Sequence, residues 1–241
     1  MKKKNKAIYL LFLMPFVYFA TACFVVWLVK TSGIYPSGSD TMYHVYRGDY
    51  VYNAIKSGNW YPLYDPAWYN GVEILRYWSP FPAYVMAFCQ YLAGGSQFGA
   101  YLFYIGGVCF LGACVWPFIG RGFNRPYLGA FIGLLWFFMP NNLCAIFIEG
   151  NLARSLSMIF LPVFIYSVYK YLYNHKLRYI PLMVFTFLLM ELCHLGYAGM
   201  VAIAVIIYGI VYIIQKGRKK AVLDVVISMI FGFMLLGIWL G

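Results

Sequence analysis

The sequence is built from apolar runs that are each about as long as a membrane is thick. These runs lie at 7–29, 98–119, 127–148, 155–173, 179–197, 198–215 and 221–241. A helix needs about 20 apolar residues to cross a bilayer, and inside it the backbone must satisfy its own hydrogen bonds. Since 63% of the residues are hydrophobic, the sequence predicts an all-α, polytopic transmembrane helix bundle with about seven spans.

A shorter apolar segment at 80–94 decides the predicted topology. If it lies on the membrane surface and the N-terminus is inside, most of the 18 Lys and Arg residues face the inner side. They then fall in the N-terminal tail and in the turns at 120–126, 170–178 and 216–220. If the segment spans, the later loops change sides and this bias disappears. The positive-inside rule therefore favours a surface helix, within a long extracytoplasmic first loop that carries interfacial helices.

The remaining composition limits the class of protein. We expect residues 1–241 to form a single integral membrane domain and, because the sequence ends within an apolar run, to be the N-terminal fragment of a longer chain. The net charge of +11 sits in short clusters between apolar runs, so we expect no nucleic-acid partner. The six cysteines lie in apolar runs without a C-x-x-C pair, which indicates neither a disulfide framework nor a zinc site. No nucleotide-binding motif is present, and we expect no nucleotide cofactor.

With this topology, nearly all the acidic side chains converge on the outer face. Three segments supply them: the first loop at 30–80, the turn EGNLAR at 149–154, and the stretch ELCHLGYAG at 191–199. Ionisable groups are costly in or near a membrane, so such a concentration indicates a functional site.

The stretch SGSDTMYHVYRGDY, at 37–50, carries the first candidate residues. Asp40 either caps the start of a helix or acts as a general base, and a carboxylate desolvated at the membrane surface can have a raised pKa. Alternatively, it contributes to a divalent cation site, with Mg²⁺ or Mn²⁺ as the candidates. His44 lies four residues later on the same helical face. Arg47 follows one turn on and suits a phosphate, because a guanidinium pairs with phosphate through two hydrogen bonds.

The two later outer segments add further candidates. Glu149 and Arg154 flank the start of a helix, where free N–H groups and the helix dipole favour an anion. Glu191 and His194 form an E-x-x-H pair, which is either a polar contact inside the bundle or a pair of metal ligands on one helix face.

Aromatic residues fill the first loop, in particular the stretch SGNWYPLYDPAWYNG at 57–71. Trp60 and Trp68 belong either to an aromatic belt at headgroup level or to a platform for the apolar faces of sugars. Glycine and proline at turn positions favour an ordered loop.

These motifs resemble a known family. Asp40 and His44 after a first span, followed by GNWYPLYDPAWYNG, RYWSPFPAYVMA and EGNLARSLSMIFLP, are similar to bacterial membrane proteins called 6-pyruvoyl-tetrahydropterin synthase-related. The resemblance covers roughly residues 7 to 200. That family in turn resembles the GT-C superfamily of multi-spanning glycosyltransferases.

The resemblance implies an enzyme of the cell membrane with its site on the extracytoplasmic face. Such an enzyme transfers a sugar from a polyprenyl-phosphate carrier, held in the lipid, to an extracytoplasmic acceptor. Asp40 matches the catalytic or metal-binding acid of the first outer loop, and Glu149 matches a second acidic site. Two other interpretations remain open: a transporter or flippase for an envelope lipid or polysaccharide, and a non-catalytic glycan-binding membrane protein.

Overall fold

The computed structural model describes residues 2–36 and 38–240, and the regular structure in these residues is helical apart from one isolated bridge between Asp65 and Val72. The predicted all-α class is confirmed. Within the described chain, six segments are long and apolar enough to cross a membrane. They lie in α1 (Lys2–Ser32), α4 (Gln97–Gly122), the broken helix Pro126–Ile148, α7 (Leu152–Asn174), α9 (Leu195–Lys216) and α10 (Lys219–Leu240).

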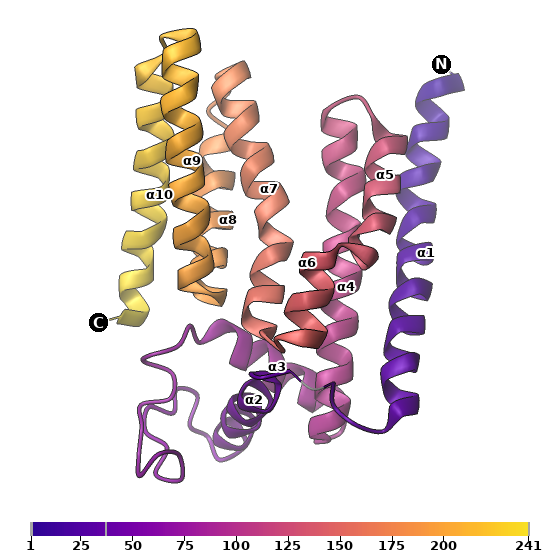
Figure 1. The fold of residues 1–241 in the computed structure, drawn as a ribbon, viewed down its shortest axis with the longest axis vertical. Coiled ribbons are helices and arrows are strands. Elements are labelled where there is room, and N and C mark those ends of the chain that lie inside the picture. The colour runs from indigo at the N-terminus through magenta and orange to yellow at the C-terminus, as the bar shows by residue number, and fades with distance from the viewer. Residues whose placement is uncertain (1, 37, 241) are drawn as a thin grey trace.

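The seventh predicted span is a shorter helix. α8 (Tyr179–Cys193) has 15 residues, about 23 Å at a rise of about 1.5 Å per residue, against a hydrocarbon core of about 30 Å. It packs between α7 and α10 (Figure 1). We predicted a span to residue 197, but the helix ends earlier because His194 has an extended backbone, with φ −156° and ψ 95°.

Two helices lie across one end of the bundle rather than along it. They are α2 (Thr41–Lys56) and α3 (Phe81–Leu92), which Figure 1 shows beneath the long helices. We call this the α2–α3 end. The turns that follow α4, α7 and α9 lie at the opposite end, where α1 begins. This arrangement agrees with the prediction that 80–94 is a surface helix.

The segment Pro126–Ile148 does not form one regular helix. It consists of α5 (Pro126–Leu135), the 3₁₀ turn η1 (Trp136–Phe138), α6 (Pro140–Leu143) and the π-helical η2 (Cys144–Ile148). Pro140 has no N–H to donate, which breaks the ladder, and Met139 is extended. The side-chain amide of Asn142 donates to the carbonyl oxygen of Trp136 at 2.8 Å and satisfies one of the freed groups. The irregular segment ends directly before Glu149.

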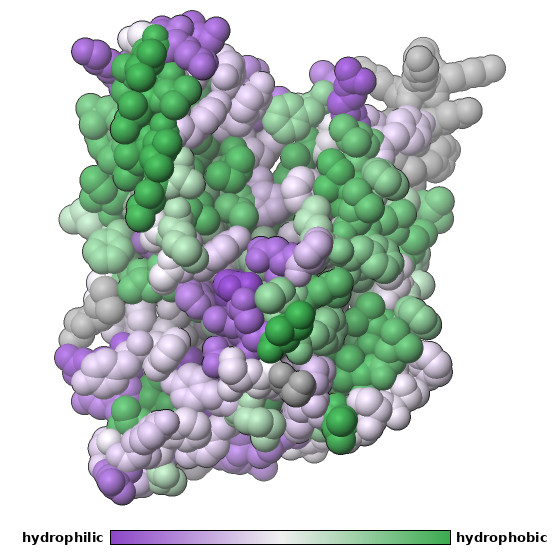
Figure 2. Space-filling model, in the orientation of Figure 1, coloured by the Kyte–Doolittle hydropathy of each residue, from purple (hydrophilic) through white to green (hydrophobic). Residues whose placement is uncertain are grey.

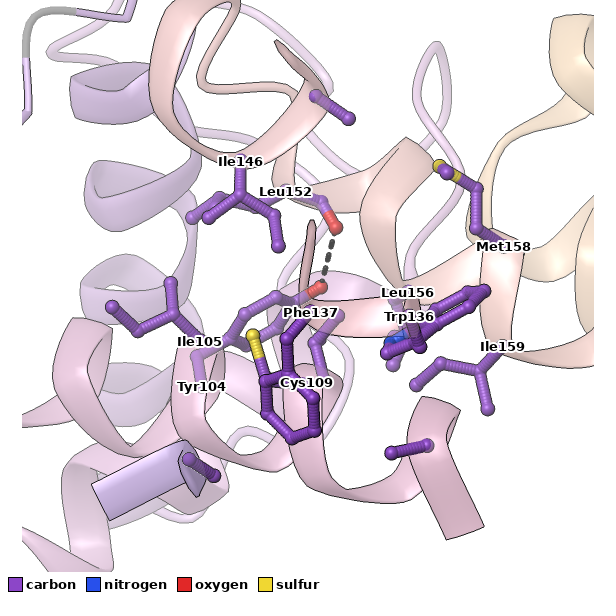
Figure 3. Close-up of a cluster of buried hydrophobic side chains, with 14 of the residues drawn as sticks. Tyr104, Ile105, Cys109, Trp136, Phe137, Ile146, Leu152, Leu156, Met158 and Ile159 are labelled. Carbon is purple, nitrogen blue, oxygen red and sulfur yellow. Dashed lines mark hydrogen bonds between the residues drawn. The ribbon is translucent and has the colours of Figure 1, made fainter. Parts of the chain in front are cut away.

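The core between α4 and α7 fixes where α7 begins. Figure 3 shows its buried side chains and the hydrogen bond that the Tyr104 hydroxyl donates to the carbonyl oxygen of Leu152, at 2.8 Å. Gly112 lets Trp136 approach α4, because a Cβ there would lie 2.3 Å from the indole nitrogen. The first turn of α7 is thereby held against α4, near α2 and α3.

The loop between α2 and α3 is folded back on itself. Asp65 is 2% exposed and pairs through its backbone with Val72. Its carboxylate accepts hydrogen bonds from the Tyr46 hydroxyl at 2.5 Å and from the Ala67 N–H at 2.9 Å. This buried acid holds the loop together. The glycine and proline residues had predicted an ordered loop.

Candidate functional site

Asp40 lies directly against Glu149. The Asp40 N–H and the Ser39 hydroxyl both donate to the Glu149 carbonyl oxygen, each at 3.0 Å. Gly150 permits this approach, because a Cβ there would lie 2.7 Å from the Thr41 nitrogen. Two segments that are far apart in the sequence therefore meet at the α2–α3 end.

Asp40 takes the N-cap position of α2, but its side chain makes no capping hydrogen bond. The His44 N–H instead bonds the main-chain oxygen of Asp40 at 3.0 Å. Asp40 therefore stands at the cap position of α2, but capping the helix does not explain why the residue carries a carboxylate.

Glu149 forms an ion pair with Arg154. The distance from Glu149 Oε2 to Arg154 Nη1 is 2.6 Å, and the side chains are 36% and 18% exposed. The Cys144 thiol donates to Glu149 Oε1 at 3.4 Å. Arg154 Nε is buried without a partner in the described structure. Arg154 therefore keeps a free donor beside its carboxylate partner.

The start of α7 is capped by Asn151. Its side-chain oxygen accepts from the Arg154 N–H at 2.9 Å. Its side-chain nitrogen lies 3.4 Å from Nε2 of His194. Asn151 thus uses one of the N–H groups that we expected to bind an anion and brings His194 to the same place.

His194 occupies the break between α8 and α9. Its Nδ1 accepts from the Tyr197 N–H at 3.0 Å and so caps α9. Burial lowers the pKa of His194, and the charge of Arg154 also lowers it, while Asp40 and Glu149 act in the opposite direction. The imidazole is therefore neutral at pH 7.

We call Asp40, Glu149, Asn151, Arg154 and His194 the polar junction. It joins the start of α2, the turn before α7 and the break between α8 and α9. Figure 2 shows strongly hydrophilic side chains gathered over α6 and the start of α7, on a face whose long helices are mainly hydrophobic. Four of these five residues are among the predicted site residues, and Asn151 is the addition that the structure makes.

His44 lies behind this junction and is 6% exposed. Burial, with the nearby charges of Arg47 and His194, lowers its pKa to about 3. The imidazole is neutral at physiological pH, so His44 is not poised to donate a proton.

Arg47 is directed inward rather than toward a ligand. It is 1% exposed, and its Nη2 donates to the carbonyl oxygens of Trp78 at 3.1 Å and Ser79 at 3.3 Å. Its guanidinium also lies 5.4 Å from the centre of the Tyr43 ring. The phosphate contact predicted for Arg47 would require these loop contacts to open.

The two predicted tryptophans lie in different surroundings. Trp68 packs on Tyr46 and Tyr43, with ring centres 4.5 and 5.2 Å apart, and Tyr43 in turn contacts Trp78 at 5.6 Å. Trp60 is 71% exposed and lies outside this aromatic cluster. Trp68 therefore packs on α2, the helix that Asp40 precedes, whereas Trp60 is exposed elsewhere in the loop.

Glu191 and His194 do not share a helix face, so that expectation is wrong. Glu191 lies in α8 and is 2% exposed with Oε2 unpartnered, whereas His194 lies beyond the helix end. No group of three or more His, Cys, Asp or Glu side chains that could hold a metal ion occurs among the described residues. The donors of the polar junction therefore do not form a metal cluster.

The sequence did not predict the contact between Gly150 and Gly38, which brings the turn before α7 against the start of α2. Gly150 has φ +67° and lies against Gly38 and Thr41. A glycine beside an acidic residue in a short turn was the available signal.

A family of membrane proteins described as 6-pyruvoyl-tetrahydropterin synthase related domain matches residues 75–241. The chain belongs to this family. The match to this synthase-related family includes Glu149, Arg154, Glu191 and His194, and begins after Asp40, Trp60 and Trp68, in the last part of the first loop. No curated protein and no solved structure matches the chain. Membership and the candidate spans together make it a membrane protein.

Proposed function

We propose that this synthase-related protein is a GT-C-like glycosyltransferase that moves a sugar from a polyprenyl-phosphate carrier to an extracytoplasmic acceptor. The observation that carries the proposal is the contact between Asp40 and the Glu149–Arg154 ion pair. Asp40, whose side chain makes no capping hydrogen bond, is joined through its main chain to Glu149, and Glu149 pairs with a guanidinium that has a free donor, in a chain of which only 10% is charged.

The two groups suit the two ends of a glycosyl transfer. The acceptor hydroxyl loses its proton as its oxygen bonds the anomeric carbon, and the Asp40 carboxylate takes that proton as general base. The bond from the anomeric carbon to the carrier phosphate breaks, and its electron pair leaves on the phosphate. Arg154 stabilises this growing negative charge. The phosphate must then share Arg154 with Glu149 or displace Glu149.

The location of the junction suits a lipid-linked donor. It lies at the α2–α3 end, where the long helices stop and the surface helices begin. A carrier whose chain is in the bilayer presents its phosphate at this level. The positive-inside arrangement of the basic turns supports an extracytoplasmic position for this end, in the cell membrane.

The aromatic cluster favours a second candidate, a non-catalytic glycan-binding protein. Tyr43 packs against Trp68 in a tilted arrangement and against Trp78 edge-to-face, beside the start of α2, and Trp78 is 51% exposed. Exposed ring faces pack well on sugars and need no carboxylate to do so.

Transfer by the purified protein in proteoliposomes separates these candidates. We expect labelled sugar to pass from a polyprenyl-phosphate donor to an acceptor, with little transfer by Arg154→Gln. Glycan binding without transfer from any donor in a panel would favour the second candidate. Movement of a lipid between leaflets without transfer would favour a flippase.

A further inference from the structure

A large apolar groove lies between α1, α3 and α4, away from the polar junction. Its volume is about 1120 Å³. Side chains such as Phe19, Trp27, Phe88 and Phe103 line it, and Lys30 is the one charged residue in its wall. A groove of this size and character takes hydrocarbon.

Two adjacent glycines of α4 shape the groove. A Cβ at Gly106 would lie 2.9 Å from a methyl carbon of Val26, so this glycine sets how closely α1 approaches α4. A Cβ at Gly107 would meet nothing within 4 Å, because Gly107 faces open space. The helices touch at one glycine and leave room beside the next.

The length of the groove matches one leaflet of a bilayer. Its wall extends from Phe19 to Lys30 on α1 and from Phe98 to Leu111 on α4. At a rise of about 1.5 Å per residue these stretches are roughly 16 to 20 Å long. Half of a hydrocarbon core of about 30 Å is close to this length.

The charged end of the groove lies at headgroup level. Lys30 is in the last turn of α1, next to the α2–α3 end, and its side chain is exposed. The ion pairs of the described residues join Arg76 to Glu73 and Arg154 to Glu149, and neither includes Lys30. The Lys30 ammonium is therefore available to an anionic headgroup.

We propose that the groove binds an anionic phospholipid of the leaflet at the α2–α3 end. One acyl chain lies along α1 and α4, and the headgroup phosphate pairs with Lys30. This inference does not depend on the proposed transferase activity, and it assigns the groove to a bound lipid rather than to the sugar carrier.

The groove also reaches the residue that fixes the start of α7. Tyr104 lines both the apolar groove and the narrow pocket beside His44 and Arg47. Its hydroxyl holds the carbonyl oxygen of Leu152 at the start of α7. Tyr104 is 2% exposed, so a chain in the groove meets the core at the residue that fixes this helix start.

Gly107→Leu tests the proposal, because the new side chain fills the groove without meeting a neighbour at Cβ. Gly199→Leu is the matched control, since Gly199 is a helical glycine of α9 that also faces open space. Each protein is purified in mild detergent, its bound lipids are quantified by mass spectrometry, and its Tm is measured with added phosphatidylglycerol or phosphatidylcholine. Circular dichroism and elution as a single species confirm that each variant is folded.

We expect the wild type and Gly199→Leu to retain an anionic phospholipid and to gain several degrees in Tm with phosphatidylglycerol. Folded Gly107→Leu should lose at least two-thirds of the lipid and the gain in Tm. Lys30→Gln should respond equally to the two phospholipids. Equal retention by Gly107→Leu and Gly199→Leu, or an isoprenoid phosphate as the bound lipid of the wild type, would overturn the proposal. Sugar transfer is not a readout, so these results stand whether or not the protein is a transferase.

Discussion

The main-chain N–H of Asp40 donates a hydrogen bond to the carbonyl oxygen of Glu149, at 3.0 Å. This bond joins the start of α2 to the turn that follows the broken helix Pro126–Ile148. The ion pair from Glu149 to Arg154 then extends the contact into α7. The surface helix α2 and the membrane helix α7 thus meet at one polar site. Substitutions that break this contact should lower the stability of the protein, and substitutions of its charged groups should lower transfer.

Gly150→Ala should separate these two segments. The added methyl would lie 2.1 Å from the Thr41 hydroxyl oxygen and 2.7 Å from the Thr41 nitrogen, and residue 150 has φ +67°. We expect a loss of more than about 2 kcal/mol in the free energy of unfolding, since steric overlap adds to the cost of a positive φ. Thermal unfolding in detergent measures it. Gly33→Ala is the control, with φ +69° and open space at Cβ; an equal loss in both variants would show that overlap at Gly150 is unimportant.

Tyr104→Phe should weaken the anchor of α7. It removes one of the two side-chain hydrogen bonds to the Leu152 carbonyl, which keeps its bond from the Ser155 hydroxyl, at a cost of about 1 kcal/mol. Tyr101→Phe is a matched change in the same helix, because the Tyr101 hydroxyl is buried without a partner in the described structure. We expect that variant to be as stable as the wild type or more stable. If the two variants unfold at the same temperature, the hydroxyl of Tyr104 does not support α7.

Acidification should destabilise the protein through His44. Its pKa is about 3 in the folded chain and 6.5 in a free side chain. The unfolded state therefore binds a proton that the folded state does not, and stability falls as the pH drops below 6.5 toward 3. From pH 7 to pH 5 the loss is about 2 kcal/mol.

His44→Gln should remove much of this loss, as measured by unfolding at both pH values. The burial of His194 lowers its pKa as well, so it adds a smaller effect of the same sign. An unchanged pH dependence in His44→Gln would contradict a neutral, buried His44.

Arg154→Gln should affect transfer far more than folding. The ion pair with Glu149 is partly exposed, and such pairs contribute about 1 kcal/mol or less to stability. Loss of a donor that stabilises the leaving phosphate should reduce kcat by about 10² to 10³. The initial rate of transfer and the Tm, both measured on one preparation of the variant and of the wild type, compare the effect on transfer with the effect on stability. A large fall in Tm with normal rates would make Arg154 a structural residue.

The helices that face lipid were predictable from hydropathy alone. The predicted runs at 98–119 and 155–173 fall inside α4 and α7. The distribution of Lys and Arg predicted a surface helix at 80–94, and α3 lies across the end of the bundle. Both signals arise from contact with the bilayer, which acts on each segment separately.

The candidate site was predictable as a set of segments but not as a geometry. Topology brought Asp40 and Glu149 to one end of the bundle, whereas their contact depends on how Gly150 and Gly38 pack. The E-x-x-H spacing misled because His194 caps α9 through its Nδ1 and so lies outside α8. Arg47 stays a predicted phosphate ligand, and sequence does not reveal the two carbonyl oxygens that it meets.

The most direct test of the account is sugar transfer by Asp40→Asn in proteoliposomes, with a polyprenyl-phosphate sugar that the wild type uses. Glu73→Gln is the matched control, since Glu73 is an acid of the same loop that pairs with Arg76. Removal of a general base lowers the rate by about 10² to 10⁴, so we predict a loss of at least about 100-fold in Asp40→Asn and normal transfer in Glu73→Gln. Undiminished transfer by a folded Asp40→Asn protein would contradict the assignment of Asp40 as the base.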